Sequence, residues 1–323
     1  MTYLKTLLVV ILSYFLYLPA LAANCKATTP SDSSIVNFLQ DEYHVKFTNN
    51  NRIVVFKTGK EKFDDLFPAI RAAKESIHLE YFNFRNDSIS KELFTLLVHK
   101  AAEGVKVRAL FDGFGNSSNN RPLRRRHLDS LRARGIEIYE FDPIRFPYLN
   151  HIAHRDHRKI VVIDGQVAYT GGMNVADYYI MGKPEFGEWR DLHTRVEGDA
   201  VGELQRVFLE FWNKVTKQNI HGPQYYPGEK DARQNFGMLK QDTTPTAGTK
   251  QVGVVNRVPK ATPRIIHDTF IHSINTAEKQ ILIINPYLTL CRHLKKALKN
   301  AAKRGVDVQI MVSEKSDIPI TPR

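Results

Sequence analysis

Cysteine is scarce in this sequence of 323 residues, and the two that it contains, Cys25 and Cys291, lie near opposite ends. A disulfide framework needs several cysteines, and a zinc knuckle needs them in closely spaced pairs. Neither pattern is present. The sequence therefore excludes a small disulfide-rich fold, and we predict no structural role for either cysteine.

Long apolar runs are also scarce, and the clearest one, Thr6 to Leu18, is short for a membrane-spanning helix. It follows a single positive charge at Lys5 and precedes Ala20-Leu21-Ala22, which fits a small-residue cleavage site. This pattern predicts a signal peptide over residues 1–22 and an exported protein of the cell envelope, periplasmic or membrane-associated. A retained membrane anchor is the alternative that stays open.

Acidic residues are outnumbered by basic ones, 34 against 46, which gives a formal net charge of +12. Such an excess favours a polyanionic partner, either nucleic acid or an anionic bilayer, and does not distinguish the two. The densest basic run contains Arg121 and Arg124 to Arg126. A solvated start of a helix explains this run equally well.

One segment, HRKIVVIDGQVAYTGGMN, is dense in chemistry-bearing residues. Ile160 to Ile163 is a short β-branched run typical of a buried strand, Asp164-Gly165 is a turn signal, and Val167 to Thr170 fits a return strand. His157 and Lys159 stand two apart before the first strand. Their side chains therefore leave the same face of an extended chain.

The predicted hairpin brings Gly171, Gly172 and Asn174 back beside His157 and Lys159. Glycines let backbone amides approach an oxyanion closely, so this pair is a candidate phosphate-binding element. The pocket would combine a nucleophile, a cation and a neutral amide donor. These are the groups that a protein needs to attack and hold a phosphodiester.

The same residues allow two other interpretations. His151, His154 and His157 fall three apart and, with Asp156, could form a zinc cluster. However, the segment opens a strand rather than a helix, and a metal leaves Lys159 and the GGMN sequence unexplained. A solvated basic hairpin does not account for six fixed positions either. We therefore expect no metal and no cofactor.

The spacing HxKxxxxDxxxxxxGGxN resembles the signature of the phospholipase D superfamily. The resemblance implies that His157 attacks phosphorus to form a phosphohistidine. It also implies that Lys159 and Asn174 bind the non-bridging phosphate oxygens. Asp164, the remaining member of the motif, would belong to the structural frame of the site.

A second segment, EWRDLHTRVEG, resembles the W-R-D-x-x-x-R-V-x-G strand of the same superfamily. Members place a carboxylate behind the catalytic histidine, where it accepts a bond from the far ring nitrogen and fixes the tautomer. The resemblance assigns this role to Asp191. Glu185 is the alternative carboxylate, and either residue could instead be a plain surface charge.

The length exceeds one typical domain, and an internal repeat accounts for the excess. Residues 63–112 recur at 269–313, with Gly104 matched to Gly305. The same offset would place a second copy of His157 at about position 360, beyond Arg323. In two-copy members one histidine is the nucleophile and the other the general acid. We expect a protein that continues past Arg323; two chains paired about a two-fold axis are the alternative.

Alternating strands and helices predict an α/β fold, with a mixed sheet flanked by helices on both faces. The resemblance implies a phospholipase D-like sheet, with one complete repeat plus the start of a second. The predicted organisation is a signal peptide or anchor at 1–22, a lead at 23–51, a first domain with the motif at 52–216, a linker at 217–250, and a partial second domain without its motif at 251–323.

The segments around both motifs are most similar to bacterial cardiolipin synthases of the phospholipase D type. This implies a phosphatidyltransferase that moves a phosphatidyl group between phosphatidylglycerol molecules, with no cofactor. The expected partners are anionic phospholipid, a membrane surface, and a missing second half or second chain that completes the site; nucleic acid is disfavoured. The alternatives are an exported phospholipase D or nuclease, and a degenerate lipid- or nucleic-acid-binding module.

Overall fold

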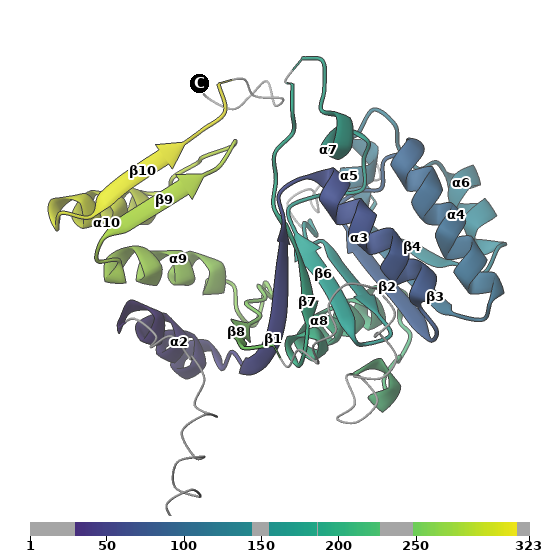
Figure 1. Ribbon diagram of the computed structural model, residues 1–323, viewed down its shortest axis with the longest axis horizontal. Helices are drawn as coiled ribbons and strands as arrows, with labels where there is room; N and C mark the ends of the chain where they lie inside the picture. Colours follow the sequence, from purple (N-terminus) through teal and green to yellow (C-terminus); the bar gives the residue numbers. More distant parts are fainter. Residues whose placement is uncertain (1–29, 144–154, 186, 227–247, 315–323) are drawn as a thin grey trace, which may run out of the picture. The chain divides into compact units, whose positions relative to one another are not determined.

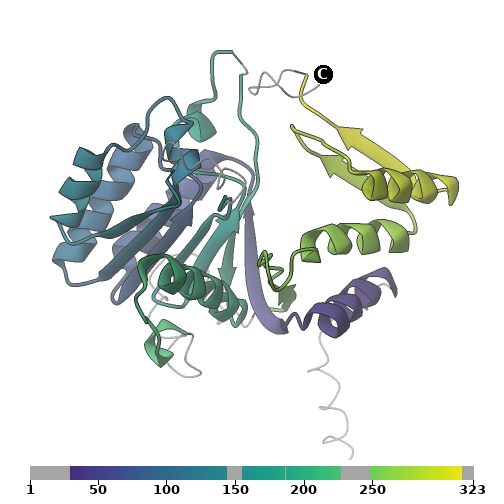
Figure 2. The same cartoon turned by 180° about the vertical axis from the view of Figure 1, so that it is seen from behind.

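The computed structural model describes residues 30–143, 155–185, 187–226 and 248–314 (Figures 1 and 2). The chain divides into two compact units. The large unit comprises Val45–Pro263 with Val312–Arg323, and the small unit comprises Met1–His44 with Arg264–Met311. The predicted leader and most of the predicted linker lie outside the described residues. The predicted domain limits therefore stay predictions.

An eight-stranded mixed sheet forms the centre of the large unit, in the order β4-β3-β2-β5-β6-β7-β1-β8. Strands β2, β3 and β4 run parallel, whereas the pairs from β2·β5 to β1·β8 are antiparallel. The strands are β1 (Phe47–Phe56), β2 (Ser76–Tyr81), β3 (Lys106–Asp112), β4 (Glu137–Phe141), β5 (Ile160–Ile163), β6 (Val167–Gly171), β7 (His193–Glu197) and β8 (Lys250–Gly253).

Helices cover both faces of this sheet (Figures 1 and 2). The side chains of strand β5 alternate between the two layers. Val161 and Ile163 join the core under α3 and α4, whereas Ile160 and Val162 face α8. The predicted mixed sheet flanked by helices is confirmed. The helices of this unit are α3 (Gly59–Ala72), α4 (Ser88–Ala102), α5 (Gly113–Ser117), α6 (Arg125–Arg132), α7 (Tyr178–Met181), α8 (Ala200–Thr216) and the short 3₁₀ helix η2 (Pro223–Tyr225).

The β5–β6 hairpin turns where the sequence predicts. Asp164 and Gly165 have φ angles of 52° and 64°, which the turn requires, and the Gln166 N–H donates to the Ile163 carbonyl at 2.9 Å. The Asp164 carboxylate also accepts hydrogen bonds at 2.8 Å from three successive backbone amides at the start of β2, those of Lys74, Glu75 and Ser76. Asp164 thus ties the turn to the neighbouring strand.

We expect Asp164→Ala to lower the free energy of unfolding by about 2 kcal/mol or more, because three amides lose a charged acceptor. Asp164→Asn should cost less, since asparagine tolerates a positive φ and keeps one acceptor oxygen. Urea denaturation of both variants measures the difference. If the free energy of unfolding were unchanged in both variants, the structural role of this carboxylate would be contradicted.

The small unit repeats part of the large one. It contains α2 (Pro30–Tyr43), α9 (Ile265–Thr276), β9 (Gln280–Ile284), α10 (Arg292–Lys303) and β10 (Asp307–Met311). Its order α9-β9-α10-β10 matches α3-β2-α4-β3, and both strand pairs are parallel. Gly104 and Gly305 end equivalent helices with φ angles of 95° and 90°. The start of a second repeat is therefore present. By contrast, β8, which reaches into the range predicted for the second domain, pairs with β1 in the large unit.

Candidate active site

The chain just before β5 is anchored on both sides of His157. The Asp156 backbone N–H donates to the buried carboxylate of Asp112 at 2.8 Å. The Arg158 Nε lies 2.6 Å from a carboxylate oxygen of Glu80 and 2.9 Å from one of Asp156. Burial first, and then the charge of Asp156, raise the pKa of Glu80 well above its usual range. Glu80 and Asp156 thus hold Arg158, the residue next to His157, in place.

His157 and Lys159 meet directly. The Lys159 Nζ lies 3.0 Å from Nδ1 and 3.2 Å from Nε2 of His157, and it donates to the His157 carbonyl oxygen at 2.7 Å. The Phe82 ring packs against the imidazole, with 4.6 Å between the ring centroids. The lysine is buried, at 3 % exposure, whereas His157 is exposed. An incoming group can thus reach the imidazole while the cation stays behind it.

The electrostatics of this pair suit nucleophilic attack. Partial burial of the imidazole lowers the pKa of His157 to about 4, and the charge of Lys159 adds to this effect. Burial lowers the pKa of Lys159 to about 8, although Asp156, Asp191 and Asp112 oppose it. At neutral pH the histidine therefore keeps its lone pair while the lysine is still charged.

Asn174 is held in place by a lysine that sequence reasoning missed. The buried Lys62 ammonium on α3 donates to the backbone carbonyls of Met173 at 3.0 Å and Asn174 at 3.2 Å. The Asn174 side chain accepts from the Asn83 N–H at 3.3 Å and donates to the Tyr179 hydroxyl at 3.4 Å. Burial lowers the pKa of Lys62. A lysine in an amphipathic helix gives no sequence signal for this role.

We expect Lys62→Met to lower the free energy of unfolding by about 1–3 kcal/mol, because two buried carbonyl groups lose their donor. Amide hydrogen exchange around Met173 and Asn174 should accelerate in the same variant. Lys60→Met is the matched control, since Lys60 is exposed on the same helix and pairs with Asp64, one turn away. Equal urea midpoints for the two variants would contradict a holding role for Lys62.

Asp191 lies at the site but does not bond to His157. Its Oδ1 accepts from the Leu192 N–H at 2.7 Å, and among the described residues no hydrogen bond joins it to the imidazole. Its negative charge instead acts on Lys159 and Lys62, whose pKa values it raises against the effect of burial. Asp191 therefore supports the two cations, and its predicted role as the histidine's partner stays a prediction.

The glycine pair is needed for close packing. A Cβ on Gly171 would lie 2.7 Å from Nδ1 of the buried His193, and a Cβ on Gly172 would lie 2.1 Å from a carboxylate oxygen of Asp191. The Gly172 amide donates to the Leu192 carbonyl at 2.8 Å. The pair thus lets β7 approach the hairpin, and its role in binding phosphate stays a prediction.

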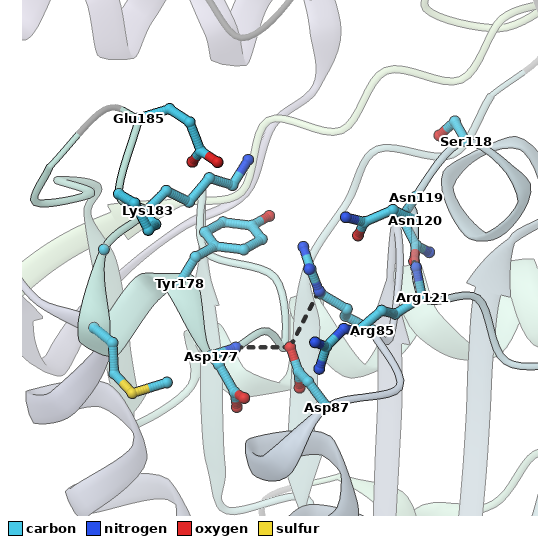
Figure 3. Close-up of a pocket in the computed structure, with 13 residues that line it drawn as sticks. Arg85, Asp87, Ser118, Asn119, Asn120, Arg121, Asp177, Tyr178, Lys183 and Glu185 are labelled. Atoms are coloured by element: carbon cyan, nitrogen blue, oxygen red, sulfur yellow. Dashed lines mark hydrogen bonds and ion pairs between the residues drawn. The ribbon is translucent and has the colours of Figure 1, made fainter.

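Glu185, the alternative carboxylate, lies elsewhere in the large unit. It lines a pocket of about 650 Å³ together with Arg85, Tyr178 and Lys183 (Figure 3). In this pocket Arg85 Nε lies 3.5 Å from the Asp87 carboxylate. None of the lining residues belongs to the His157 site. The structure thus separates Glu185 from the residues that the motif brings together.

The described residues give little support to the zinc interpretation of this segment or to a special role for the basic run. His151 and His154 of the zinc alternative lie outside them, and the Asp156 carboxylate is bound by Arg158. The exposed run Arg124 to Arg126 forms the start of α6, where Arg125 pairs with Asp129 one turn on. This placement agrees with the solvated helix start.

The His157 site opens into a cavity of about 320 Å³. His157, Lys159 and Gly171 line it, and much of the remaining wall is apolar. Leu204 and Val207 of α8 contribute to this wall, together with Val254 and Val255 after β8. The cavity therefore joins a charged, nucleophilic rim to a surface that favours hydrocarbon.

The family comparison agrees with this geometry. Residues 66–191 and 270–323 match the family model described as "Cardiolipin synthase, PLD-like domain". This chain belongs to that family. The matched ranges include the whole His157–Asn174 motif, Asp191 and most of the repeat in the small unit. Membership thus confirms the resemblance inferred from the motif.

Individual relatives point the same way. The cardiolipin synthase of Halalkalibacterium halodurans is 36 % identical over 275 residues, covering 84 % of this chain and 51 % of the relative. The major cardiolipin synthase ClsA of Bacillus subtilis is 34 % identical, covering 91 % of this chain and 58 % of the relative. The chain spans about half the length of the curated relatives that it matches.

A solved structure supports the fold of this family member. The phosphatidylserine synthase of Haemophilus influenzae superposes with a TM-score of 0.58 at 15 % identity, covering 86 % of this chain and 66 % of the other. Such low identity establishes the shared fold alone. The α/β architecture described above is therefore that of known phospholipase D-like proteins.

The predicted localisation, an exported protein of the cell envelope, is wrong. The relatives are bacterial cardiolipin synthases, and neither they nor the described residues support export. Among the described residues, no helix has the length and apolar character needed to cross a membrane. The prediction failed because a charge followed by a short apolar segment is shared by leaders and anchors.

Proposed function

We propose that this chain carries a phosphatidyltransferase site of the cardiolipin synthase type. The observation that carries the proposal is the pairing of an exposed, neutral His157 with a buried ammonium 3.0 Å away, at the rim of a cavity with an apolar wall. The apolar wall favours a lipid, whose acyl chains it can contact, over a nucleic acid, whose sugar-phosphate backbone carries no such chain. Family membership supports the same chemistry.

The proposed reaction has two steps. A ring nitrogen of His157 attacks the phosphorus of phosphatidylglycerol, so that an N–P bond forms while the P–O bond to the departing glycerol breaks. Lys159 and the Asn174 amide stabilise the charge on the non-bridging oxygens. The hydroxyl of a second phosphatidylglycerol then attacks the phosphohistidine, which regenerates His157 and gives cardiolipin.

Proton transfer requires a second group. The departing glycerol must gain a proton and the incoming hydroxyl must lose one, which is the task of a general acid and base. This sequence holds one copy of the motif. We propose that a second motif histidine, from the same polypeptide or from another chain, performs this task.

A substrate with an activated leaving group tests the first step separately. Phosphatidyl-p-nitrophenol releases an acidic phenol that needs no proton, so the site with a single motif should react once per chain. We expect a burst of nitrophenol and an acid-labile phosphate on His157. Adding phosphatidylglycerol to the loaded protein should then yield cardiolipin. If two chains complete the site, the yield of cardiolipin should rise with protein concentration as the chains associate.

The other outcomes are equally defined. Phosphatidic acid as the sole product, even with excess phosphatidylglycerol, would indicate a hydrolase. A faster burst with bis(p-nitrophenyl) phosphate, accompanied by cleavage of DNA, would indicate a nuclease. A complete absence of burst with every diester would leave the binding module as the better description.

The burst rate should depend on pH at both ends. Below a pH of about 4 the imidazole of His157 is protonated and cannot attack, so the rate rises as pH increases through this value. Above about 8 Lys159 loses its proton and its charge, so the rate falls. Stopped-flow measurements in detergent micelles will show the two limbs. A rate that still climbs above pH 9 would contradict the role of Lys159.

A further inference from the structure

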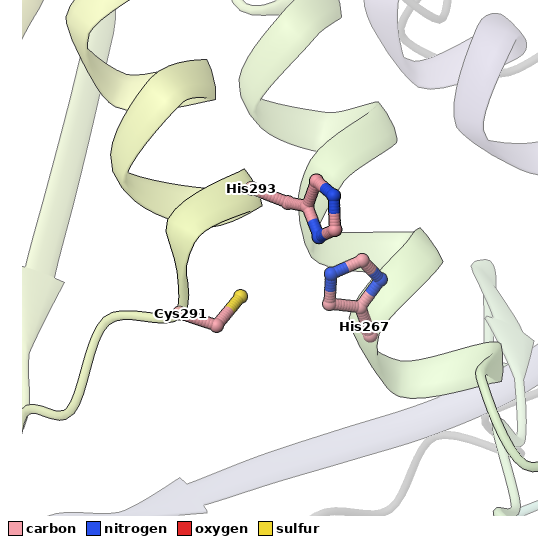
Figure 4. A group of neighbouring side chains, drawn as sticks. All are labelled: His267, Cys291 and His293. Atoms are coloured by element: carbon pink, nitrogen blue, oxygen red, sulfur yellow. The ribbon is translucent and has the colours of Figure 1, made fainter.

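A group of metal-ligand side chains lies in the small unit, which does not contain the motif that the proposed function uses. His267 is in the first turn of α9, Cys291 caps the N-terminus of α10, and His293 follows in the first turn of α10 (Figure 4). One ligand atom from each residue lies within 4.8 Å of the other two. All three side chains are at least partly accessible to solvent.

The two helices that carry these residues pack together. Ile274 of α9 and the α10 residues Ala297, Leu298 and Ala301 belong to one buried cluster, which also includes Val306. The helix starts are therefore fixed relative to each other, so the three ligands need only side-chain rotation to converge. The His267 and His293 rings are already nearly perpendicular, with 5.7 Å between their centroids.

The neighbouring carboxylate of Asp268 orients the His267 ring. Its Nδ1 lies 2.7 Å from the Asp268 carboxylate, so the neutral ring donates from Nδ1 and keeps the lone pair on Nε2. Asp268 is itself held by the Tyr43 hydroxyl at 2.7 Å and by Arg264 at 3.1 Å. Although burial raises it, these hydrogen bonds lower the pKa of Asp268, which stays ionised. A carboxylate behind a ligating histidine is the usual support of a metal site.

The surroundings of Cys291 also favour loss of its thiol proton. The backbone N–H of Leu294, followed by the His267 side chain, lowers the pKa of the Cys291 thiol. Among the described residues, Cys291 has no disulfide partner. Its sulfur is therefore available to a metal at the start of α10, where backbone amides favour the negative charge that remains once the thiol proton has left.

We propose that Nε2 of His267, Sγ of Cys291 and a ring nitrogen of His293 bind a zinc ion, with solvent at the fourth position. Two imidazoles and one thiolate suit a borderline ion such as Zn²⁺ better than Mg²⁺ or Ca²⁺, which prefer oxygen. Tetrahedral zinc bonds separate ligand atoms by about 3.5 Å, so the three groups must close by about 1 Å. Binding replaces the thiol proton, which is released to solvent, and the ion then links α9 to α10.

Titration calorimetry of the full 323-residue chain, stripped of metal and kept reduced, tests the site. We expect one zinc ion per chain, and Co²⁺ in its place should show a thiolate-to-metal absorption band. Cys291→Ser should remove the band, and His293→Ala should weaken zinc binding by more than a hundredfold. Asp268→Asn should weaken it by about 10–100-fold, as expected for loss of an outer-shell partner.

Two controls separate this site from other ligands in the chain. Cys25→Ser removes the remaining cysteine, and His221→Ala removes an exposed histidine of the large unit; both should leave the affinity and the Co²⁺ band unchanged. Zinc should also raise the melting temperature of the wild-type chain and not that of Cys291→Ser. Zinc binding that persists unchanged in Cys291→Ser and His293→Ala would overturn the proposal, as would an absence of binding in the wild type.

Discussion

Replacing His157 with alanine is expected to abolish the nitrophenol burst and the covalent phosphate together. The imidazole is neutral at physiological pH because its pKa is lowered to about 4, and it is exposed at the cavity rim. Among the described residues that line the cavity there is no other imidazole and no thiol, so we expect water not to replace His157 at a comparable rate. Rapid quenching without acid, followed by mass spectrometry, detects the phosphoprotein.

His99→Ala is the matched control for this experiment. His99 is an exposed histidine on α4 that pairs with Glu103 on the surface, so its loss should change neither the burst nor the label. A phosphoprotein of undiminished yield in His157→Ala would show that another side chain is the nucleophile, and the assignment would fail.

Replacing Lys159 with methionine should slow the burst about a hundredfold or more, the usual loss when one oxyanion donor is removed. Methionine approximates the length of the lysine stem but carries no charge. The Lys159 Nζ lies within 3.2 Å of both ring nitrogens of His157, from where it would reach the phosphate oxygens in the proposed reaction. The alkaline limb of the pH profile should disappear in this variant, because the group that titrates at about pH 8 is gone.

The same variant has a readout that does not require turnover. The charge of Lys159 contributes to the low pKa of His157, so removing it should raise that pKa toward the ordinary value. Titration of the ring resonances by NMR measures the shift. Lys91→Met, an exposed change on α4, should move neither the rate nor the pKa. An imidazole pKa that stays near 4 in Lys159→Met would show that the two groups are not coupled.

The parts of the site that sequence analysis anticipated are those encoded locally. The hairpin was predictable because the β-branched run, the Asp164-Gly165 turn and the return strand are consecutive, and a two-residue period places His157 beside Lys159. The repeat was predictable for a similar reason, since Gly104 and Gly305 each end a helix where a positive φ is required.

Contacts between distant segments were not predictable in this way. Lys62 reaches Met173 across 111 residues, and nothing in the α3 sequence distinguishes it from the exposed Lys60. Asp191 packs so closely on Gly172 that a Cβ there would lie 2.1 Å from its carboxylate oxygen, and this approach of the two segments has no local sequence signal. Cys291 is far from His267 in sequence, so their proximity follows only from the packing of α9 on α10.

The position of β1 has a consequence for synthesis of the protein. Its neighbours in the sheet are β7 and β8, and both follow it by more than a hundred residues. While the ribosome is still producing the parallel strands and the hairpin, β1 has neither neighbour available. Unpaired strand edges promote association with other chains, and pairing over such separations is slow. The nascent chain is therefore most prone to aggregate before His193–Glu197 emerges, and a chaperone that shields residues 47–56 would protect it during that interval.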